Sequence, residues 1–168
     1  MKQSELQKEL NKFKAYVIRE SQNNLSKLGK DKGKLFESID ARVKANANSF
    51  EMEFVMEQYG IYQDKGLSGT ERKFNTPYKY TTKAPPPKAF DKWSVKKGLA
   101  PRKNGKLTSR KSLQYALSRH IFKKGIKPSL FFTKPFEAAF KKLPSDLIDK
   151  FGLEALTLFN ESIYLTKK

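Results

Sequence analysis

Few residues of this chain could carry out catalysis, and the motifs that they form lack required positions. The segment Gly66-Leu67-Ser68-Gly69-Thr70 approaches the G-x-S-x-G turn that exposes a nucleophilic serine, but that turn requires glycine where Thr70 stands. The serine would also need a histidine base, and the only histidine, His120, falls among leucine and isoleucine positions of a predicted helix. This pattern favours a packed or edge histidine over a catalytic base.

Other patterns for catalysis or cofactor binding are also incomplete. The sequence holds neither a G-x-x-x-x-G-K-[ST] phosphate loop nor a G-x-G-x-x-G dinucleotide turn. Glu51, Glu53 and Glu57 fall on one face of a predicted strand, where a solvated face is expected, and Asp64 is expected to be a turn residue. Because the chain has no cysteine and one histidine, thiolate and histidine-cluster metal sites are excluded. We therefore expect no enzymatic activity, no cofactor and no metal.

The composition is that of a folded protein. Its 168 residues suffice for one domain with a core, and a hydrophobic fraction of 38% with 13 Phe is too high for a disordered chain of this charge. We predict a single domain over residues 1–168. No stretch approaches the roughly 20 apolar residues of a membrane span, and the polar N-terminus does not read as a secretory signal, so we expect a soluble protein without membrane association.

The positive charge is concentrated in the middle of the chain. The formal net charge is +18, with +2 in residues 1–70, +17 in residues 71–142 and −1 in residues 143–168. A segment of this charge repels itself unless it faces an anion, such as nucleic acid or an acidic protein surface. A solvated lysine-rich surface is the plainer interpretation of the same pattern.

Periodicity predicts two helices and a strand in the first third of the chain. Apolar residues at helical spacing predict a helix over 5–28, which Gly29 would end, and a second helix over 34–44. Over 50–58 the period changes to two, with Phe and Met alternating with Glu, which predicts a strand with one buried face. A turn at 46–49 precedes this strand.

The remainder of the chain predicts an insertion followed by helices. Residues 71–107 are basic, rich in proline and without periodicity, which is typical of an arm that holds at most a short docked helix around Trp93. A helix capped by Thr108 or Ser109 and ending at Lys124 is apolar on two sides, so one side is expected to pack against a neighbouring subunit. A last helix is predicted from Ser145 to about Phe159. The resulting fold class is α+β, a small antiparallel sheet packed against helices with a long basic insertion.

A cluster of basic residues is the candidate surface for an anionic partner. Arginine, which reads guanine edges, is scarce in it, whereas lysine acts as a point charge on phosphate. The cluster therefore suggests non-specific contact with a nucleic-acid backbone, and non-specific nucleic-acid binding is the alternative function of the chain. Its members are Lys96, Lys97, Arg102, Lys103, Lys106, Arg110, Lys111, Arg119, Lys123 and Lys124.

Three segments, in order, resemble the neck or tail-completion proteins of tailed bacteriophages. Lys32–Leu35 with Ser38-Ile39 is similar to that family's turn before a short Leu-x-x-Ser-Ile element. Tyr59–Gly66 with Gly69-Thr70 is similar to its pattern of tyrosines, an acidic residue and Gly-Thr, and Phe131–Phe140 to its closing aromatic-Pro-aromatic-Ala segment. The likeness covers roughly residues 5–70 and 108–160, and the basic insertion departs from it.

The resemblance implies a virion structural protein with a geometric function. Subunits of this family close a homo-oligomeric ring between the portal, connector and tail proteins and leave a channel for double-stranded DNA. It implies localisation at the head–tail junction of the virion, after assembly in the host cytoplasm. On this reading the arm over 71–111 reaches a neighbouring protein or the channel, and a smaller set of residues shapes the subunit fold or its contacts, namely Tyr59, Tyr62, Gly66 and Gly69.

Overall fold

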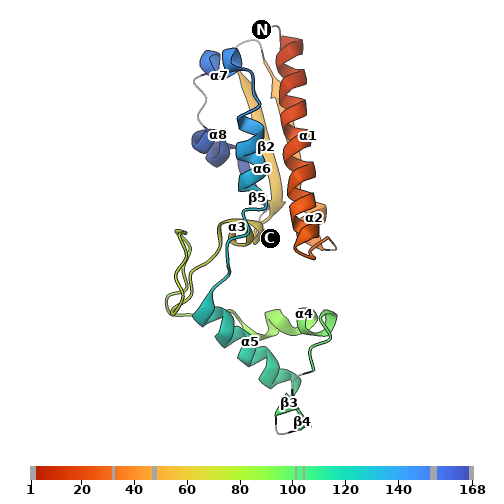
Figure 1. Cartoon of the computed structure of the whole chain (residues 1–168), viewed down its shortest axis with the longest axis vertical. Coiled ribbons are helices and arrows are strands. Elements are labelled where there is room, and N and C mark those ends of the chain that lie inside the picture. Colours follow the sequence, from red (N-terminus) through yellow and green to blue (C-terminus); the bar gives the residue numbers. More distant parts are fainter. Residues whose placement is uncertain are drawn as a thin grey trace. The chain divides into compact units, whose positions relative to one another are not determined.

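The computed structural model divides into two compact units (Figure 1). Unit 1 combines residues 1–64 with residues 130–168, and unit 2 comprises residues 65–129. Unit 2 therefore contains the predicted insertion and extends beyond it at both ends, while the single-domain prediction stays a prediction. The structure describes residues 3–31, 33–46, 49–100, 102–103, 105–151 and 155–166.

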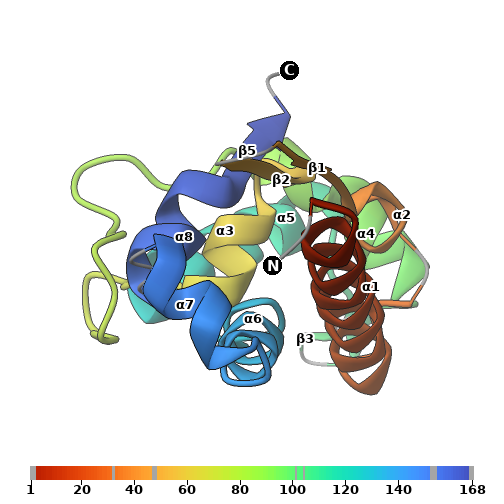
Figure 2. The ribbon, with the colours of Figure 1, turned by 90° about the horizontal axis from the view of Figure 1, so that it is seen from above.

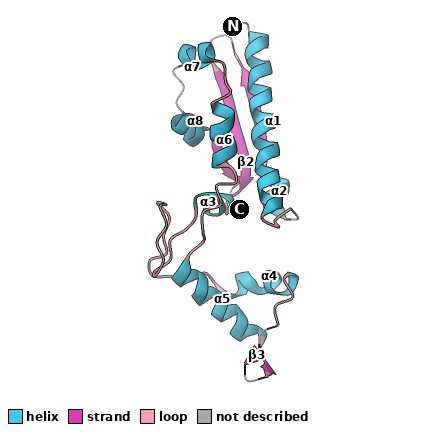
Figure 3. Cartoon of the chain, in the orientation of Figure 1, coloured by secondary structure: helices cyan, strands magenta, loops and turns pink. Residues whose placement is uncertain are grey.

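Unit 1 contains a three-stranded sheet and most of the helices (Figure 3). None of the helices among the described residues combines the length and apolar character needed to cross a bilayer. In chain order the elements are α1 (Gln3–Lys27), α2 (Lys34–Ser38), β1 (Asp40–Ala45), β2 (Phe50–Glu57), α3 (Gly60–Lys65), α6 (Thr133–Phe140), α7 (Ser145–Phe151), α8 (Ala155–Ser162) and β5 (Ile163–Thr166).

The sheet has the order β1-β2-β5. β1 and β2 are antiparallel, with Ala45 opposite Phe50, and β5 lies parallel to the second half of β2, with Ile163 opposite Phe54. The predicted α+β class with an antiparallel pair is confirmed, and β5 adds a parallel strand that the sequence analysis did not predict. Figure 2 shows α1, α6, α7 and α8 gathered on one side of the strands.

The core of unit 1 lies between this sheet and its helices. Met52, Phe54 and Met56 of β2 are buried, so the predicted alternation is confirmed. The ring of Phe54 lies 5.3 Å from that of Phe132, and the ring of Phe136 lies 5.2 Å from that of Phe13, both edge to face. Such pairs each contribute about 1 kcal/mol beyond the area they bury. The aromatic cluster therefore fixes α6 against α1 and β2.

Helix α1 and its end agree with the prediction. Its apolar stripe, from Leu6 to Leu25, is buried. Gly29 has a φ of 65°, and the amides of Gly29 and Lys30 donate to the carbonyls of Ser26 and Leu25. This is the Schellman arrangement, which glycine adopts without the steric cost of a Cβ.

The helix predicted over 34–44 is wrong in its second half. α2 ends at Ser38, and residues 40–45 form β1, in which Ala41 and Ala45 are buried while Arg42 and Lys44 are exposed. The same six residues alternate with period two, so they fit a strand as well as a helix. Pairing with β2 decides between the two, because tertiary contacts override weak local preference.

The outer edge of β1 is occupied by a side chain of α1. The amide group of Gln7 donates from Nε2 to the carbonyl of Val43 at 3.1 Å and accepts at Oε1 from the amide of Ala45 at 2.7 Å. One side chain thus mimics a neighbouring strand for two residues. This reduces the exposed hydrogen-bonding groups through which an edge strand pairs with another chain.

Replacing this side chain tests its contribution. We expect Gln7→Ala to lower the free energy of unfolding by about 2 kcal/mol, because two net hydrogen bonds of about 1 kcal/mol each are lost. Gln7→Glu retains the acceptor for Ala45 and should lose less. Urea unfolding followed by far-ultraviolet circular dichroism measures both, and equal stability of Gln7→Ala and the wild type would contradict the assignment.

The C-terminal helix prediction covers two described helices. The predicted helix from Ser145 to about Phe159 corresponds to α7 and α8, and residues 152–154 between them lie outside the described residues.

Within the turn predicted at 46–49, residues 47 and 48 are likewise outside the described residues. Its two ends are joined, because the amide of Asn46 donates to the carbonyl of Ser49.

Unit 2 has short elements around one helix. The chain is extended after Gly66, at the start of unit 2. Isolated β-bridges there pair Leu67 with Ile126 and Ser68 with Lys79. None of the buried hydrophobic residues among the described residues belongs to unit 2. Its elements are the 3-10 helix η1 (Pro87–Phe90), α4 (Asp91–Lys96), β3 (Arg102–Lys103), β4 (Lys106–Leu107) and α5 (Arg110–Lys124).

Helix α5 begins and ends as predicted but buries different residues. The Ser109 hydroxyl accepts from the amide of Ser112, and Gly125, with φ of 71°, ends the helix. Its buried side chains are Gln114 and Ser118, whereas Tyr115 is 61% exposed. On the second apolar side of the helix, Tyr115 is therefore open, whereas Phe122 is half-buried with its ring 5.8 Å from that of Tyr80. Cover of this side by a neighbouring subunit stays a prediction.

The short helix predicted around Trp93 exists as α4, but it docks by polar contacts. The Asp91 carboxylate accepts from Gln114 Nε2, and Ser94 is buried. Trp93 is 46% exposed and Val95 60% exposed, so these two apolar side chains do not anchor the helix.

Candidate functional site

The carboxylate of Asp64, at the end of α3, joins two segments that are far apart in the sequence. Oδ1 accepts from the amides of Phe132 at 2.8 Å and Thr133 at 3.1 Å, and Oδ2 accepts from the Thr133 hydroxyl. The main-chain carbonyl of Asp64 accepts from the amide of Leu130. Asp64 is only 1% exposed, so these contacts are made away from solvent.

Asp64 supplies the cap that α6 lacks. Phe132 occupies the N-cap position of α6 and has no side chain that can accept a hydrogen bond. A carboxylate at this position satisfies free amides of the first turn, and its charge is also favourable near the positive end of the helix dipole. The contact places α6, and with it Phe136, against the core.

A second contact joins Tyr59 to α2. Gly33, at the N-cap position of α2, forms no side-chain cap, and the Tyr59 hydroxyl accepts from the amide of Leu35 at 3.0 Å. Burial raises the pKa of Tyr59 above 10.0, against the opposing effect of this hydrogen bond, and the nearby charge of Glu57 raises it further. Tyr59 is therefore a neutral hydroxyl over the physiological range.

Ser38 and Gly60 tighten the same contact. The Ser38 hydroxyl accepts from the amide of Glu57 at 3.0 Å, which ties the end of α2 to the end of β2. A Cβ at Gly60 would lie 2.8 Å from both Leu35 Cδ1 and Met56 Sδ. The three segments that carry the family resemblance thus meet at Tyr59 and Asp64.

The role of Asp64 can be tested by substitution. We expect Asp64→Ala to lower the free energy of unfolding of unit 1 by about 3 kcal/mol, because buried amides lose a charged acceptor. Asp64→Asn retains an oxygen and should lose about 1 kcal/mol. Hydrogen exchange of residues 130–140 and urea unfolding measure the effect, with the exposed residue Asp31, changed to Ala, as the control. Equal losses for the Asp64→Ala and Asp31→Ala variants would be incompatible with the cap.

In unit 2, two glycines allow two backbones to touch. A Cβ at Gly69 would lie 2.1 Å from the carbonyl oxygen of Lys123, and a Cβ at Gly125 would lie 2.0 Å from that of Leu67. Real Cβ atoms do not approach main-chain atoms this closely, so only glycine fits at both positions. Gly66, with φ of 80°, makes a similar approach to the carbonyl oxygen of Ile126.

The close contact of residues 66–72 with residues 122–126, here called the glycine crossing, also caps the C-terminus of α5. The amide of Thr70 donates to the carbonyl of Phe122, and the amides of Glu71 and Arg72 donate to that of Lys123. Carbonyls that would be unpaired at the helix end are thereby satisfied. Gly66 and Gly69 therefore shape the fold of unit 2, and their part in subunit contacts stays a prediction.

The glycine crossing predicts a severe effect of one methyl group. We expect Gly69→Ala to destabilise unit 2 by about 3 kcal/mol, because the backbones must separate and lose their hydrogen bonds. Gly33→Ala is the matched control, since nothing lies within 4 Å of a Cβ there. Hydrogen exchange of peptides from residues 65–129 should rise in the first variant and not in the second. Unchanged exchange in Gly69→Ala would exclude the glycine crossing.

The predicted basic residues divide into two groups in the structure. Three of them hold the acidic residues of unit 2: Lys123 Nζ and Lys124 Nζ lie 2.8 and 3.2 Å from the Glu71 carboxylate, and Arg110 Nε lies 2.5 Å from Asp91. Both lysines lower the pKa of Glu71 by donating hydrogen bonds to it. The side chain of Lys103 lies outside the part of the chain that the structure describes. The other six are exposed, namely Lys96, Lys97, Arg102, Lys106, Lys111 and Arg119.

The remaining predicted site residues are placed as follows. Tyr62 is half-buried in α3. His120 is exposed on α5, so of the packed or edge histidine that the helical wheel favoured, the packed alternative is wrong. The structural importance of Asp64 was missed, because it was expected to be a simple turn residue and its partner Thr133 lies 69 residues later.

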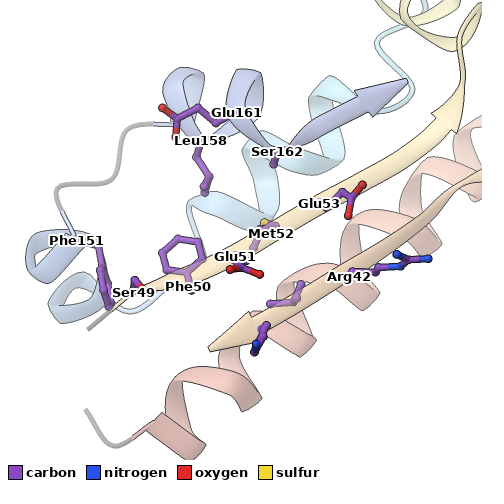
Figure 4. Close-up of a pocket in the computed structure, with 12 residues that line it drawn as sticks. Arg42, Ser49, Phe50, Glu51, Met52, Glu53, Phe151, Leu158, Glu161 and Ser162 are labelled. Atoms are coloured by element: carbon purple, nitrogen blue, oxygen red, sulfur yellow. The ribbon is translucent and has the colours of Figure 1, made fainter. Parts of the chain in front are cut away.

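A groove of about 870 Å³ lies beside the first half of β2 (Figure 4). Phe50, Phe151 and Leu158 form its apolar lining, and the rings of Phe50 and Phe151 meet edge to face at 5.4 Å. Glu51, Glu53 and Glu161 are among its polar lining residues. Because β5 pairs only with residues 54–57 of β2, the groove borders a length of strand edge that β5 does not cover.

Comparisons of the chain with models of protein families, with curated proteins and with solved structures gave no significant match. The resemblance to phage neck proteins therefore stays a prediction from the three segments.

Proposed function

We propose that this chain is a structural, non-enzymatic subunit of a tailed-bacteriophage virion, forming a ring at the head–tail junction around the path of the DNA. The observation that carries the proposal is the convergence of the three resembling segments. Tyr59 of the second segment hydrogen-bonds to Leu35 of the first, and Asp64 of the second to Phe132 and Thr133 of the third. Segments that meet in one place form a single structural unit, which is what a shared fold would require.

The edges of the sheet support a directional contact between copies. Gln7 occupies the edge of β1, whereas the edge of β2 beside the groove is left uncovered by β5. A contact that uses one surface of a subunit and a different surface of its neighbour generates rings when the rotation closes. An extended segment of a neighbouring copy could add to the β2 edge and place side chains in the groove.

The proposal assigns the neighbouring virion proteins as further partners. The portal, the connector and the tail proteins would contact the two ends of such a ring. Leu28, which is 48% exposed, and Tyr59, which is 50% exposed, are apolar residues of unit 1 available for contacts of this kind.

Mass and location test the proposal together. We expect the purified protein to form a ring, visible by electron microscopy and as a multiple of the 19.4 kDa chain by light scattering, and to be found at a single vertex of its parent virion. A protein that stays monomeric at all concentrations and is absent from virions would overturn the proposal.

A matched pair of charge reversals tests the groove as the contact. We expect Glu161→Arg to shift the ring towards monomer, because Glu161 lines the groove. Glu137→Arg changes an exposed residue of α6 that does not line it and should leave the ring intact. Equal behaviour of the two variants would place the contact elsewhere on the subunit.

A further inference from the structure

Unit 2 carries nearly all the net charge of the protein. Residues 65–129 contain 18 basic and 2 acidic side chains, a net charge of +16, which leaves +2 for the rest of the chain. Both acidic residues, Glu71 and Asp91, are already held by basic residues of the same unit. The excess charge is therefore not compensated within unit 2.

The fold of unit 2 opposes this repulsion only weakly. Its buried residues among those described include the polar side chains Ser68, Gln114 and Ser118, and the buried hydrophobic residues lie in unit 1. Hydrogen bonds and glycine contacts join the segments of unit 2, and its described apolar side chains are at most partly buried, as in the pair Tyr80 and Phe122 with rings 5.8 Å apart. Apolar burial, which dominates stability in most domains, is therefore smaller here than in unit 1. A bound polyanion would relieve the repulsion and stabilise the folded form by mass action.

A groove in unit 2 gathers four cations. It measures about 700 Å³ and is lined by Lys88 of η1, Lys92 of α4, and Arg110 and Lys111 of α5. Asp91 also lines it, but its carboxylate pairs with Arg110 at 2.5 Å and accepts from Gln114. Arg110 thus neutralises the one acidic group of the groove, and the three lysines give it a positive potential.

Exposed aromatic rings accompany the cations on α5 and α4. Lys111, Tyr115 and Arg119 follow one another at intervals of one helical turn, so the Tyr115 ring stands between two cations on one side of the helix. Trp93 follows Lys92 in α4 and is also exposed. Flat rings beside phosphate-binding cations are the surfaces on which unpaired bases stack.

We infer that unit 2 binds the sugar-phosphate backbone of nucleic acid in this groove, with phosphates on Lys88, Lys92 and Lys111 and an adjacent sugar or base against Tyr115. Lysine supplies 14 of the 18 basic residues of the unit, which suits contacts with phosphates that do not depend on base sequence. An acidic protein partner would be expected to meet more arginine and a larger apolar surface. The inference does not depend on ring formation.

The test uses the full-length protein and two labelled probes, a short single strand and the duplex of the same sequence. Fluorescence anisotropy over a range of salt concentrations gives the affinity and its salt dependence. We expect the combined variant Lys88→Gln, Lys92→Gln and Lys111→Gln to reduce the slope of log affinity against log salt by about 2 to 3, since each phosphate contact contributes about 0.9. The control removes the same charge from exposed residues of unit 1, by changing Lys8, Lys27 and Lys141 to Gln.

A second variant separates the two forms of nucleic acid. Tyr115→Leu keeps an apolar side chain but removes the ring, so it should weaken single-strand binding roughly tenfold, as loss of one stacked base does. If the wild type binds the single strand more tightly and the variant loses that advantage, unpaired bases are the ligand. If the wild type binds the duplex at least as tightly and the variant leaves that binding unchanged, the duplex backbone is the ligand. Both results support the inference.

Three outcomes would overturn it. They are an absence of salt-dependent binding to either probe, equal losses in the groove variant and its unit 1 control, and binding of polyglutamate as tight as that of both nucleic acids. Hydrogen exchange provides a readout independent of affinity: added nucleic acid should slow exchange in residues 65–129 and leave unit 1 unchanged. Because monomers suffice for these measurements, their failure is distinct from a failure to form rings.

Discussion

The buried carboxylate of Asp64 is the interaction on which the arrangement of unit 1 depends. It accepts two main-chain amides and one hydroxyl at the start of α6, and it does so from the last turn of a different helix, α3. The residues it holds, Phe132 and Thr133, lead directly into the aromatic cluster around Phe54 and Phe136. A buried carboxyl group is favourable only when its hydrogen bonds are satisfied, so the position of α6 and the burial of Asp64 support each other.

Unit 2 is stabilised by a different balance of forces. Its segments are joined by main-chain contacts at Gly69 and Gly125 and by ion pairs of Glu71 and Asp91, with little buried apolar surface. Electrostatic repulsion therefore forms a larger share of its free energy than it does in unit 1. The same imbalance that weakens the unit on its own makes it responsive to an anionic partner, so that binding and folding are thermodynamically linked.

The sequence predicted the elements whose signals are local. α1, β2 and α5 have strong periodicity, and glycine or serine marks their ends, so each was found close to its observed bounds. β1 was assigned to a helix because its six residues fit both periods, and β5 was missed because its parallel partner lies over a hundred residues earlier. The basic surface could be listed from the sequence, but the ion pairs that occupy Arg110, Lys123 and Lys124 depend on folding. The Asp64 cap was unpredictable for the same reason.

The amide of Leu130 donates to the carbonyl of Asp64 at 3.0 Å, so the two ends of unit 2 leave unit 1 at adjacent positions. For an insertion with neighbouring ends, the entropic cost of closing the host chain grows only slowly with its length, by about 0.6 kcal/mol for each doubling of a flexible insertion. Unit 2 can consequently be exchanged, shortened or enlarged in evolution without a change in the path of the surrounding chain. The junction at Asp64 and Leu130 is therefore a site at which a segment of different length and charge could replace unit 2 while unit 1 keeps its fold.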